Sequence, residues 1–203
     1  MVLAPRVYLL SPARTSSVRA QQLLESASPL GVALRSREGA AIGEVFAYLS
    51  SLYFRGKLAY ASRFGAAELS TPGALVITPG HGLCRPSTRV RAADLIAMGQ
   101  IDVDAENPEF VQPLLRDAGR LLKSAPDDTG FVLLGSIATP KYVEPLLSVL
   151  GERLLFPQEF VGRGDMSRGG LLLRAAREAA QLAYVPVHST VRNGPRARSI
   201  HAQ

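Results

Sequence analysis

Residues 160–170 hold the side chains whose types and spacing best suit chemistry. The segment reads Phe-Val-Gly-Arg-Gly-Asp-Met-Ser-Arg-Gly-Gly and runs directly into the apolar residues 171–174. Glycines such as Gly164 and Gly169 let backbone N–H groups or another backbone approach closely. A helix N-terminus adds unpaired donors and partial positive charge. We therefore predict an anion-binding site in this segment.

The side chains of this segment suggest individual roles. Arg163 and Arg168 can each grip a phosphate or carboxylate with two hydrogen bonds. Asp165 can hold a ribose hydroxyl or a metal-bound water, or act as a base, and Ser167 is predicted to cap the helix that follows. The alternative is that Asp165 pairs with one of the arginines and that the segment is a tight structural connection.

His81 is a second candidate, within the Pro-Gly-His-Gly of residues 79–82. Histidine titrates near neutral pH and can act as an acid, a base or a donor to an oxyanion. We expect Gly80 to expose it and to contact a ligand, and we name His81 and Asp165 as the catalytic candidates. The alternative for His81 is a loop histidine that is hydrogen-bonded to the backbone.

Two further segments follow predicted strands and offer ligand contacts. Ser11 belongs to the first, and Gly135, Ser136 and Lys141 belong to the second. The second lacks the Walker glycine–lysine spacing, and its serine is not in a hydrolase Gly-x-Ser-x-Gly elbow. No dinucleotide fingerprint follows any predicted strand. The alternative is that residues 139–140, Thr-Pro, only begin a helix.

The elements that must position these residues can be predicted from apolar patterning. Continuous apolar runs predict strands buried on both faces, as parallel strands are, and they cover residues 6–10, 74–78, 131–134, 153–156 and 183–187. Pro186 favours an edge position for the last run.

Helical patterns fill the intervals between these runs. They cover residues 15–25, 42–64, 109–123, 141–150 and 171–182. Gly56 in the longest of them indicates a kink, a break or a close packing contact. Arg55 lies on the less apolar side of that helix, with Lys57 nearby. This side is predicted to face solvent.

The alternation of strands and helices predicts an α/β fold, a three-layer, Rossmann-like parallel sheet of about five strands with helices on both faces. Residues 1–191 are predicted to form a single domain, and residues 192–203 a basic, loose C-terminal tail. Ligands bind such sheets beyond the carboxyl ends of the strands. The four candidate segments are therefore expected at one edge of the sheet.

Composition limits the classes of protein. The 203 residues are 47% hydrophobic and 20% charged, which fits a folded domain rather than a disordered chain. The lone Cys84 excludes an internal disulfide framework and a multi-cysteine zinc site. We find no apolar run of membrane-spanning length and no signal-peptide pattern. We therefore predict a cytoplasmic protein without membrane contact, predict no metal site and assign no cofactor.

Charge is distributed unevenly along the chain. The net charge is +6, and residues 161–203 carry seven arginines against two acidic residues. Residues 102–128 carry seven acidic residues against three basic ones. Such asymmetry can indicate a face for nucleic acid. The alternative is a compositional bias, since the chain has 20 arginines and 3 lysines.

Three functions are compatible with these patterns. The first is binding of a phosphorylated or nucleotide-like small molecule at the C-terminal edge of the sheet, with transferase or hydrolase activity. The second is nucleic-acid binding by the basic C-terminal third. The third is a non-catalytic regulatory or partner domain. The sequence leaves open whether the protein is an enzyme and which oligomer it forms.

Four sequence blocks carry a resemblance. They are residues 11–13, 52–60, 134–139 and 160–173, and they resemble blocks of an uncharacterised bacterial protein family. The likeness spans most of the chain. It implies a bacterial cytosolic setting and transfers no catalytic residue.

Overall fold

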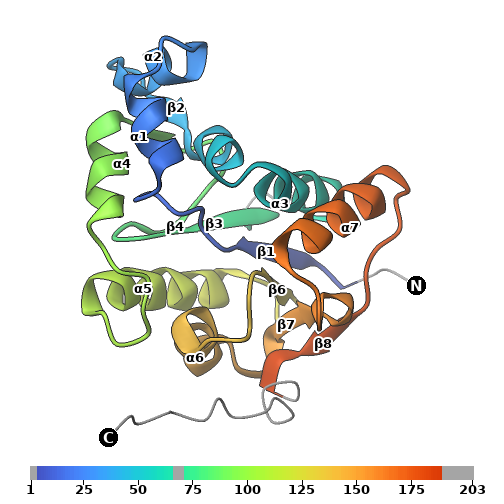
Figure 1. Cartoon of the computed structure of the whole chain (residues 1–203). Coiled ribbons are helices and arrows are strands. Elements are labelled where there is room, and N and C mark those ends of the chain that lie inside the picture. The colour runs from blue at the N-terminus through green and yellow to red at the C-terminus, as the bar shows by residue number, and fades with distance from the viewer. Residues whose placement is uncertain (1–3, 66–70, 189–203) are drawn as a thin grey trace, which may run out of the picture.

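The central feature of the molecule is a mixed, mostly parallel sheet. The computed structural model describes residues 4–65 and 71–188, and six strands form this sheet within those ranges (Figure 1). In spatial order they are β4 (Gly82–Cys84), β3 (Ala74–Thr78), β1 (Arg6–Leu10), β6 (Gly130–Leu134), β7 (Leu154–Pro157) and β8 (Tyr184–Pro186). The four inner strands are parallel, and both edge strands are antiparallel to their neighbours. The predicted α/β fold is confirmed.

Seven α-helices accompany the sheet in the described ranges. They are α1 (Val18–Glu25), α2 (Pro29–Arg35), α3 (Ile42–Phe64), α4 (Ala92–Gly99), α5 (Pro108–Ser124), α6 (Pro140–Leu150) and α7 (Asp165–Arg177). Short 3-10 turns, Gly151–Arg153 and Gln158–Phe160, flank β7, and a small second sheet pairs β2 (Ala40–Ala41) with β5 (Arg89–Val90). None of the described helices is both long and apolar enough to cross a membrane.

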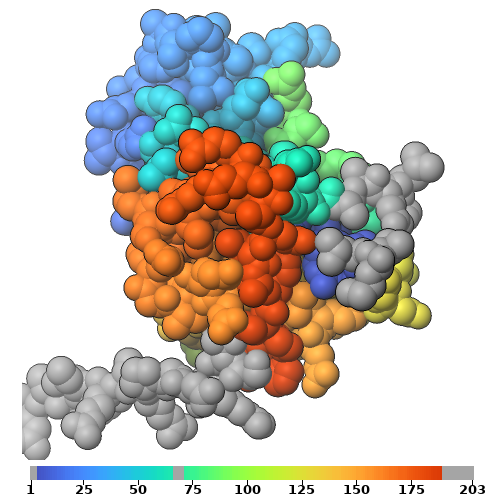
Figure 2. Space-filling model, turned by 90° about the vertical axis from the view of Figure 1, so that its right-hand side faces the viewer, coloured from blue at the N-terminus to red at the C-terminus, as the bar shows by residue number. Residues whose placement is uncertain are grey.

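The helices form a layer on each face of the sheet. In Figure 1, α3 and α7 cover one face, and α5 and α6 cover the other. Figure 2 shows α7 at the centre of one side of the molecule, beside α3. The inner strands are buried from both sides, since the side chains from Val7 to Leu10 and from Phe131 to Leu134 are almost fully inaccessible. This burial explains the continuous apolar runs.

The edge strands confirm one narrower prediction and add a strand that was not predicted. β8 lies at the edge of the sheet, where Pro186 was expected to place it. β4 was not predicted; it returns antiparallel to β3 through a tight hairpin at residues 79–81. The predicted tail, residues 192–203, lies outside the described residues.

Helix α3 has the predicted bounds, but its irregularity is not at Gly56. The backbone departs from helical angles at Ser51, which has φ 46° and ψ −118°. Such a conformation is costly for a residue with a Cβ, by about 1–3 kcal/mol. Gly56 instead makes a close packing contact, because a Cβ built there would lie 2.7 Å from the carbonyl oxygen of Gly169 in α7.

Helix α7 begins earlier than predicted, and the predicted cap is wrong. Gly164 is its N-cap and provides no side-chain bond, while Ser167 lies inside the first turn. The N–H of Arg168 donates to the Gly164 carbonyl at 3.0 Å. Asp165 suits the first turn because a carboxylate interacts favourably with the helix dipole. Gly169 is accommodated because it packs on the backbone of α3 rather than facing water.

Two adjacent glycines of α7 provide a direct test of this packing. A Cβ at Gly169 would lie 2.8 Å from the Tyr53 Cα and 2.9 Å from the Leu52 carbonyl. Gly169→Ala must therefore push α3 and α7 apart, and we expect it to lower the free energy of unfolding by about 1–3 kcal/mol. The change in urea denaturation midpoint measures this effect.

Gly170→Ala is the matched control for that substitution. A Cβ at Gly170 meets no atom within 4 Å. Alanine is the better helix former by about 1 kcal/mol, so this variant should be as stable as the wild type or more stable. Equal effects of the two substitutions would contradict the proposed role of Gly169 in helix packing.

Candidate functional site

A pocket lies at the carboxyl ends of β1 and β6, where the connections that leave the two strands lead to opposite faces of the sheet. β1 and β6 are parallel neighbours. Of the helices that follow them, α3 covers one face and α6 covers the other (Figure 1). Loops that leave adjacent strands toward opposite faces open a crevice at the strands' carboxyl ends. A pocket of about 360 Å³ occupies this position.

Most of the pocket wall comes from four parts of the fold, and Val103 of the α4–α5 connection completes it. Ser11 and Arg14 follow β1, Ser50, Tyr53 and Lys57 come from α3, Ser136, Lys141 and Tyr142 come from the β6–α6 connection and α6, and Asp165 comes from α7. Ser11, Ser136, Lys141 and Asp165 were predicted site residues, and the structure brings these four together.

Lys57 is the buried centre of the pocket wall. Its side chain is 1% exposed, and its Nζ donates to the Ser11 carbonyl oxygen at 2.8 Å and to the Ser11 Oγ at 2.9 Å. The Nζ also lies 4.3 Å from the ring centre of Tyr53 and 4.9 Å from that of Phe54. The prediction that this lysine belongs to a solvated face is wrong, because α7 and the end of β1 enclose it.

Burial changes the acid–base chemistry of Lys57. Loss of hydration lowers the pKa of its amine to about 7. The carboxylate of Asp165 opposes this shift, and the guanidinium of Arg168 adds to it. Within the described ranges, Lys57 has no ion pair within 4.0 Å. Much of the amine is therefore neutral at physiological pH.

Tyr53 brings an unused hydrogen-bonding group to the same wall. Its side chain is 6% exposed, and its buried hydroxyl lies beside the Arg168 guanidinium without completing a hydrogen bond to any described residue. Burial raises the pKa of Tyr53 to about 12, and the charge of Arg168 acts in the opposite direction. The phenol therefore stays protonated at neutral pH. Its hydroxyl therefore keeps a donor proton that no described residue accepts.

Two loop residues shape the mouth of the crevice. A Cβ at Gly135 would lie 2.9 Å from the Ser11 Cβ, so only glycine leaves this space to the serine. The Ser11 N–H donates to the Leu134 carbonyl at 3.2 Å, which fixes the end of β1 to β6. The Ala138 N–H donates to the Ser136 Oγ at 3.2 Å, which folds the loop back on itself.

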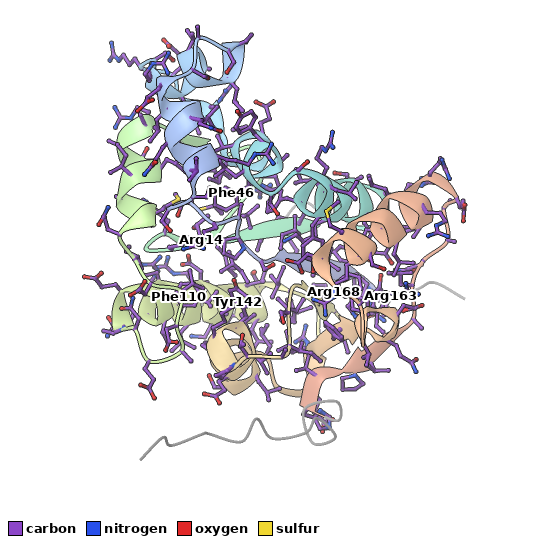
Figure 3. All side chains as sticks on the ribbon, in the orientation of Figure 1. Arg14, Phe46, Phe110, Tyr142, Arg163 and Arg168 are labelled. Atoms are coloured by element: carbon purple, nitrogen blue, oxygen red, sulfur yellow. The ribbon has the colours of Figure 1, made fainter. Side chains whose placement is uncertain are left out.

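Arg163 is turned toward its own segment rather than toward the pocket. Its Nε donates to the Glu159 carbonyl at 2.8 Å, and its Nη1 donates to the Ser167 Oγ at 3.1 Å. Figure 3 shows Arg163 on the α7 side of the molecule, away from Arg14. Ligand contact by Arg163, Gly164 or Ser167 stays a prediction.

Arg168 is also engaged within this segment. Its Nε and Nη2 donate to the Phe160 carbonyl at 3.3 and 3.2 Å, and its Nη1 lies 3.8 Å from the Asp165 Oδ1. This contact corresponds to the predicted alternative in which Asp165 pairs with an arginine. Gly169 packs against α3, so another backbone occupies the space that its missing side chain leaves. Ligand contact by Arg168 and Gly169 stays a prediction.

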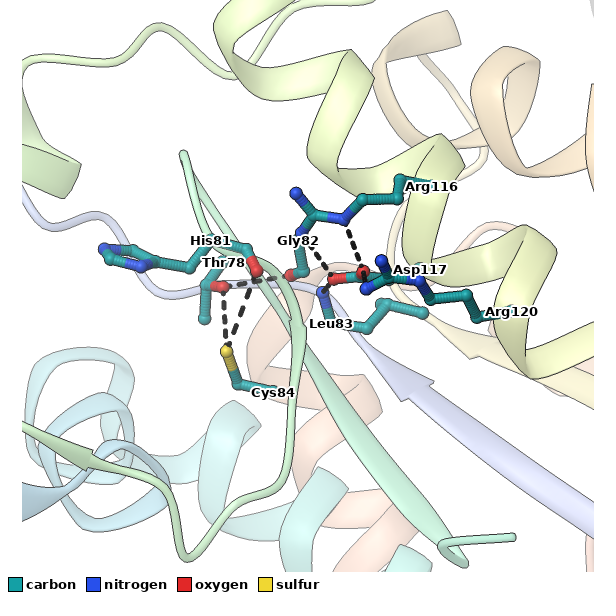
Figure 4. A network of polar contacts seen from close by, with 8 residues as sticks. All are labelled: Thr78, His81, Gly82, Leu83, Cys84, Arg116, Asp117 and Arg120. Carbon is teal, nitrogen blue, oxygen red and sulfur yellow. Dashed lines mark hydrogen bonds and ion pairs between the residues drawn. The ribbon is translucent and has the colours of Figure 1, made fainter.

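His81 lies on the exposed turn between β3 and β4, where Gly80 has a φ of 76°. The His81 N–H donates to the Thr78 carbonyl at 3.3 Å, and Figure 4 shows the imidazole directed away from Cys84 and Asp117. Neither His81 nor Gly80 lines the crevice between β1 and β6. The catalytic role of His81 stays a prediction.

The polar contacts in Figure 4 anchor the hairpin. The Leu83 N–H donates to the Asp117 Oδ2 of α5 at 3.1 Å, and the Thr78 Oγ1 donates to the Gly82 carbonyl at 2.9 Å. Cys84 lies beside them, with its Sγ 3.5 Å from the Thr78 Oγ1. In the part of the chain that the structure describes, no group of three or more His, Cys, Asp and Glu side chains is placed to hold a metal ion.

Lys57 was not among the predicted site residues, although the composition carried a signal for it. The chain has only 3 lysines against 20 arginines, and two of those lysines, Lys57 and Lys141, line the pocket. An arginine cannot lose its proton at any ordinary pH, whereas a buried lysine can. Lys57 therefore offers the pocket an amine that can lose its proton, which an arginine at that position could not provide.

Comparisons of the chain with protein-family models, with curated proteins and with solved structures find no match. The resemblance of four sequence blocks to an uncharacterised bacterial family stays a prediction. The residues and geometry of the pocket therefore carry the functional argument.

Removal of the buried amine should change how stability depends on pH. The folded-state pKa of Lys57 is about 7, below that of an exposed lysine, so the unfolded state binds more protons between about pH 7 and 10. Wild-type stability relative to Lys57→Met should rise with pH across this window, by up to about 1.4 kcal/mol per pH unit. Denaturant titrations at several pH values measure the difference.

Lys123→Met is the matched control for this experiment, because Lys123 is the remaining lysine and lies exposed near the end of α5. Its stability difference from the wild type should not change between pH 7 and 10. If the stability difference between the wild type and Lys57→Met is also independent of pH, the pKa of the buried amine is not lowered.

Proposed function

We propose that the protein binds a small anionic molecule, phosphorylated or nucleotide-like, in the pocket between the carboxyl ends of β1 and β6. The observation that carries this proposal is the charge of the lining. Arg14 and Lys141 supply two cationic side chains, and the buried Lys57 amine adds a partial positive charge, against the single carboxylate of Asp165. Such an arrangement favours phosphate or carboxylate groups.

The size and polar groups of the pocket support the same ligand class. Its volume of about 360 Å³ falls within the range of small-molecule sites. Ser11, Ser50 and Ser136 line it, and serine hydroxyl groups can donate to phosphate oxygens. Basic side chains then contribute affinity, and hydroxyl groups contribute orientation.

The reaction class that we propose is that of a transferase or hydrolase, acting in the bacterial cytosol. Binding of nucleic acid by residues 161–203 stays a separate prediction, and residues 189–203 of that stretch lie outside the described ranges. A role as a non-catalytic regulatory or partner domain is the remaining alternative. Direct binding measurements distinguish these functions.

Loss of either Arg14 or Lys141, the two pocket cations other than Lys57, should weaken anion binding. Charge-assisted hydrogen bonds contribute about 1.5–3 kcal/mol each, so Arg14→Ala and Lys141→Ala should each raise the dissociation constant at least about 10-fold. Isothermal titration calorimetry with inorganic phosphate, pyrophosphate and adenosine diphosphate measures the effect. Failure of all three probes to bind the wild type would refute the proposal.

Two controls locate the binding site. Lys123→Ala removes a lysine outside the pocket and should leave the dissociation constant unchanged. Arg163→Ala tests the segment from 162 to 170, where the arginine is engaged with its own backbone. A larger loss for Arg163→Ala than for Lys141→Ala would move the anion site to that segment. Salt-sensitive binding of DNA, unaffected by Lys141→Ala, would favour nucleic acid instead.

A further inference from the structure

Ser11 and Lys57 form a hydroxyl–amine pair with a defined orientation. The Lys57 Nζ lies 2.8 Å from the Ser11 carbonyl oxygen and 2.9 Å from the Ser11 Oγ. The carbonyl can only accept, so one N–H of the amine must point to it. When the amine is neutral, its lone pair can accept the Oγ–H proton. The carbonyl thereby orients the base toward the serine, as a carboxylate orients histidine in a serine triad.

The surroundings of the amine favour the neutral form that a base requires. Lys57 is 1% exposed and, in the described ranges, has no carboxylate within ion-pair distance. The titratable and charged side chains around it are Tyr53 from α3, Asp165 and Arg168 from α7, Lys141 and Tyr142 from α6, and Arg14 from the loop after β1. Burial is the largest influence and holds the pKa of Lys57 near 7.

The serine is held in place at the carboxyl end of β1. Ser11 directly follows β1, and its N–H donates to the Leu134 carbonyl of the neighbouring strand. Gly135 leaves room for the Ser11 side chain only because glycine has no Cβ. Ser11 and Lys57 both line the pocket, so a ligand held there lies beside the pair.

A donor for a developing oxyanion is present in the same wall. Tyr53 lines the pocket, and its hydroxyl, buried beside the Arg168 guanidinium, makes no complete hydrogen bond with a described residue. A buried hydroxyl without a partner is costly unless a ligand satisfies it. The non-helical backbone of Ser51 lies two residues before Tyr53, and backbone strain of this kind is common at functional sites.

We propose that Ser11 is a nucleophile and Lys57 its general base, and that the pocket hydrolyses a carboxylic ester or amide whose substrate also carries an anionic group. This inference rests on the proposed function, since it needs the same pocket to hold the substrate. Arg14 and Lys141 bind the anionic group, and the neutral Tyr53 hydroxyl matches the single negative charge of a tetrahedral acyl intermediate.

The first half of the reaction transfers the acyl group to the enzyme. Neutral Lys57 takes the Oγ–H proton while the Ser11 Oγ forms a bond to the acyl carbon. The carbonyl electron pair moves onto its oxygen, where Tyr53 donates a hydrogen bond. Collapse of the intermediate breaks the bond to the leaving oxygen or nitrogen, which receives the proton from the Lys57 ammonium.

The second half regenerates the enzyme with water as the co-reactant. Lys57 accepts a proton from water as the water oxygen bonds to the acyl carbon of the Ser11 ester. Collapse of this second intermediate breaks the bond to the Ser11 Oγ, and the Lys57 ammonium returns a proton to it. A carboxylic acid leaves the pocket, and no oxidant or reductant takes part.

Covalent labelling by an alkyl fluorophosphonate tests this assignment on the full chain. The activated Oγ should displace fluoride, and intact-protein mass spectrometry should show one adduct that maps to the peptide containing Ser11. Ser11→Ala should abolish the adduct. Lys57→Met and Lys57→Arg should slow labelling about 100-fold or more, since neither side chain acts as a base. The wild-type labelling rate should rise with pH around 7.

Control variants separate these effects from damage to the fold. Ser148→Ala and Lys123→Met replace a serine and a lysine outside the pocket and should keep the wild-type labelling rate. Circular dichroism identifies folded variants, and Ser11→Ala is expected to remain folded because it removes one atom. Labelling of Lys57→Arg at the wild-type rate would overturn the role of the base.

The outcomes distinguish this inference from the proposed function. Absence of labelling at Ser11, with phosphate or pyrophosphate still bound in a Lys141-dependent way, would overturn the nucleophile and leave the anion pocket standing. Labelling at Ser11 without binding of any anion would support the nucleophile and overturn the ligand class. Labelling at a different serine would overturn the assignment to Ser11.

Discussion

The arrangement of the pocket depends on the buried amine of Lys57. Removal of a lysine side chain from water is costly unless hydrogen bonds replace those lost. Here the Ser11 carbonyl and Oγ accept from the amine, and two aromatic rings surround it. The same contacts join α3 to the end of β1. An apolar side chain could fill this space at less cost, so the retained amine is more readily explained by chemistry than by stability.

A second constraint, the close approach of α3 and α7, gives the pocket its remaining wall. Gly56 and Gly169 face each other so closely that a Cβ on either would meet the opposite backbone. This contact brings Asp165, at the start of α7, to the pocket that Tyr53 and Lys57 line. A glycine in this segment can make room either for a ligand or for a neighbouring helix. At Gly169 the structure shows a neighbouring helix.

The elements of the fold were more predictable than the site, for a physical reason. Strand and helix periodicity is local, so the inner strands and α3 could be located from their own residues. The rule that ligands bind at the carboxyl ends of parallel strands pointed to the region of Ser11 and Ser136. The burial of Lys57 depends on where α7 crosses α3, which no local pattern encodes. The first turn of α7 was missed because its glycines resemble a loop until their packing partner is known.

The position of Ser11 also explains why it suits catalysis better than the hairpin histidine does. A nucleophile must be held to within a fraction of an ångström of its productive geometry, and inner strands provide such rigidity. Ser11 directly follows β1, which pairs with β3 on one side and β6 on the other, and its base reaches it from a packed helix. His81 lies on an exposed turn next to an edge strand, with solvent around its imidazole. In this fold the centre of the sheet, rather than its edge, provides fixed positions for reacting groups.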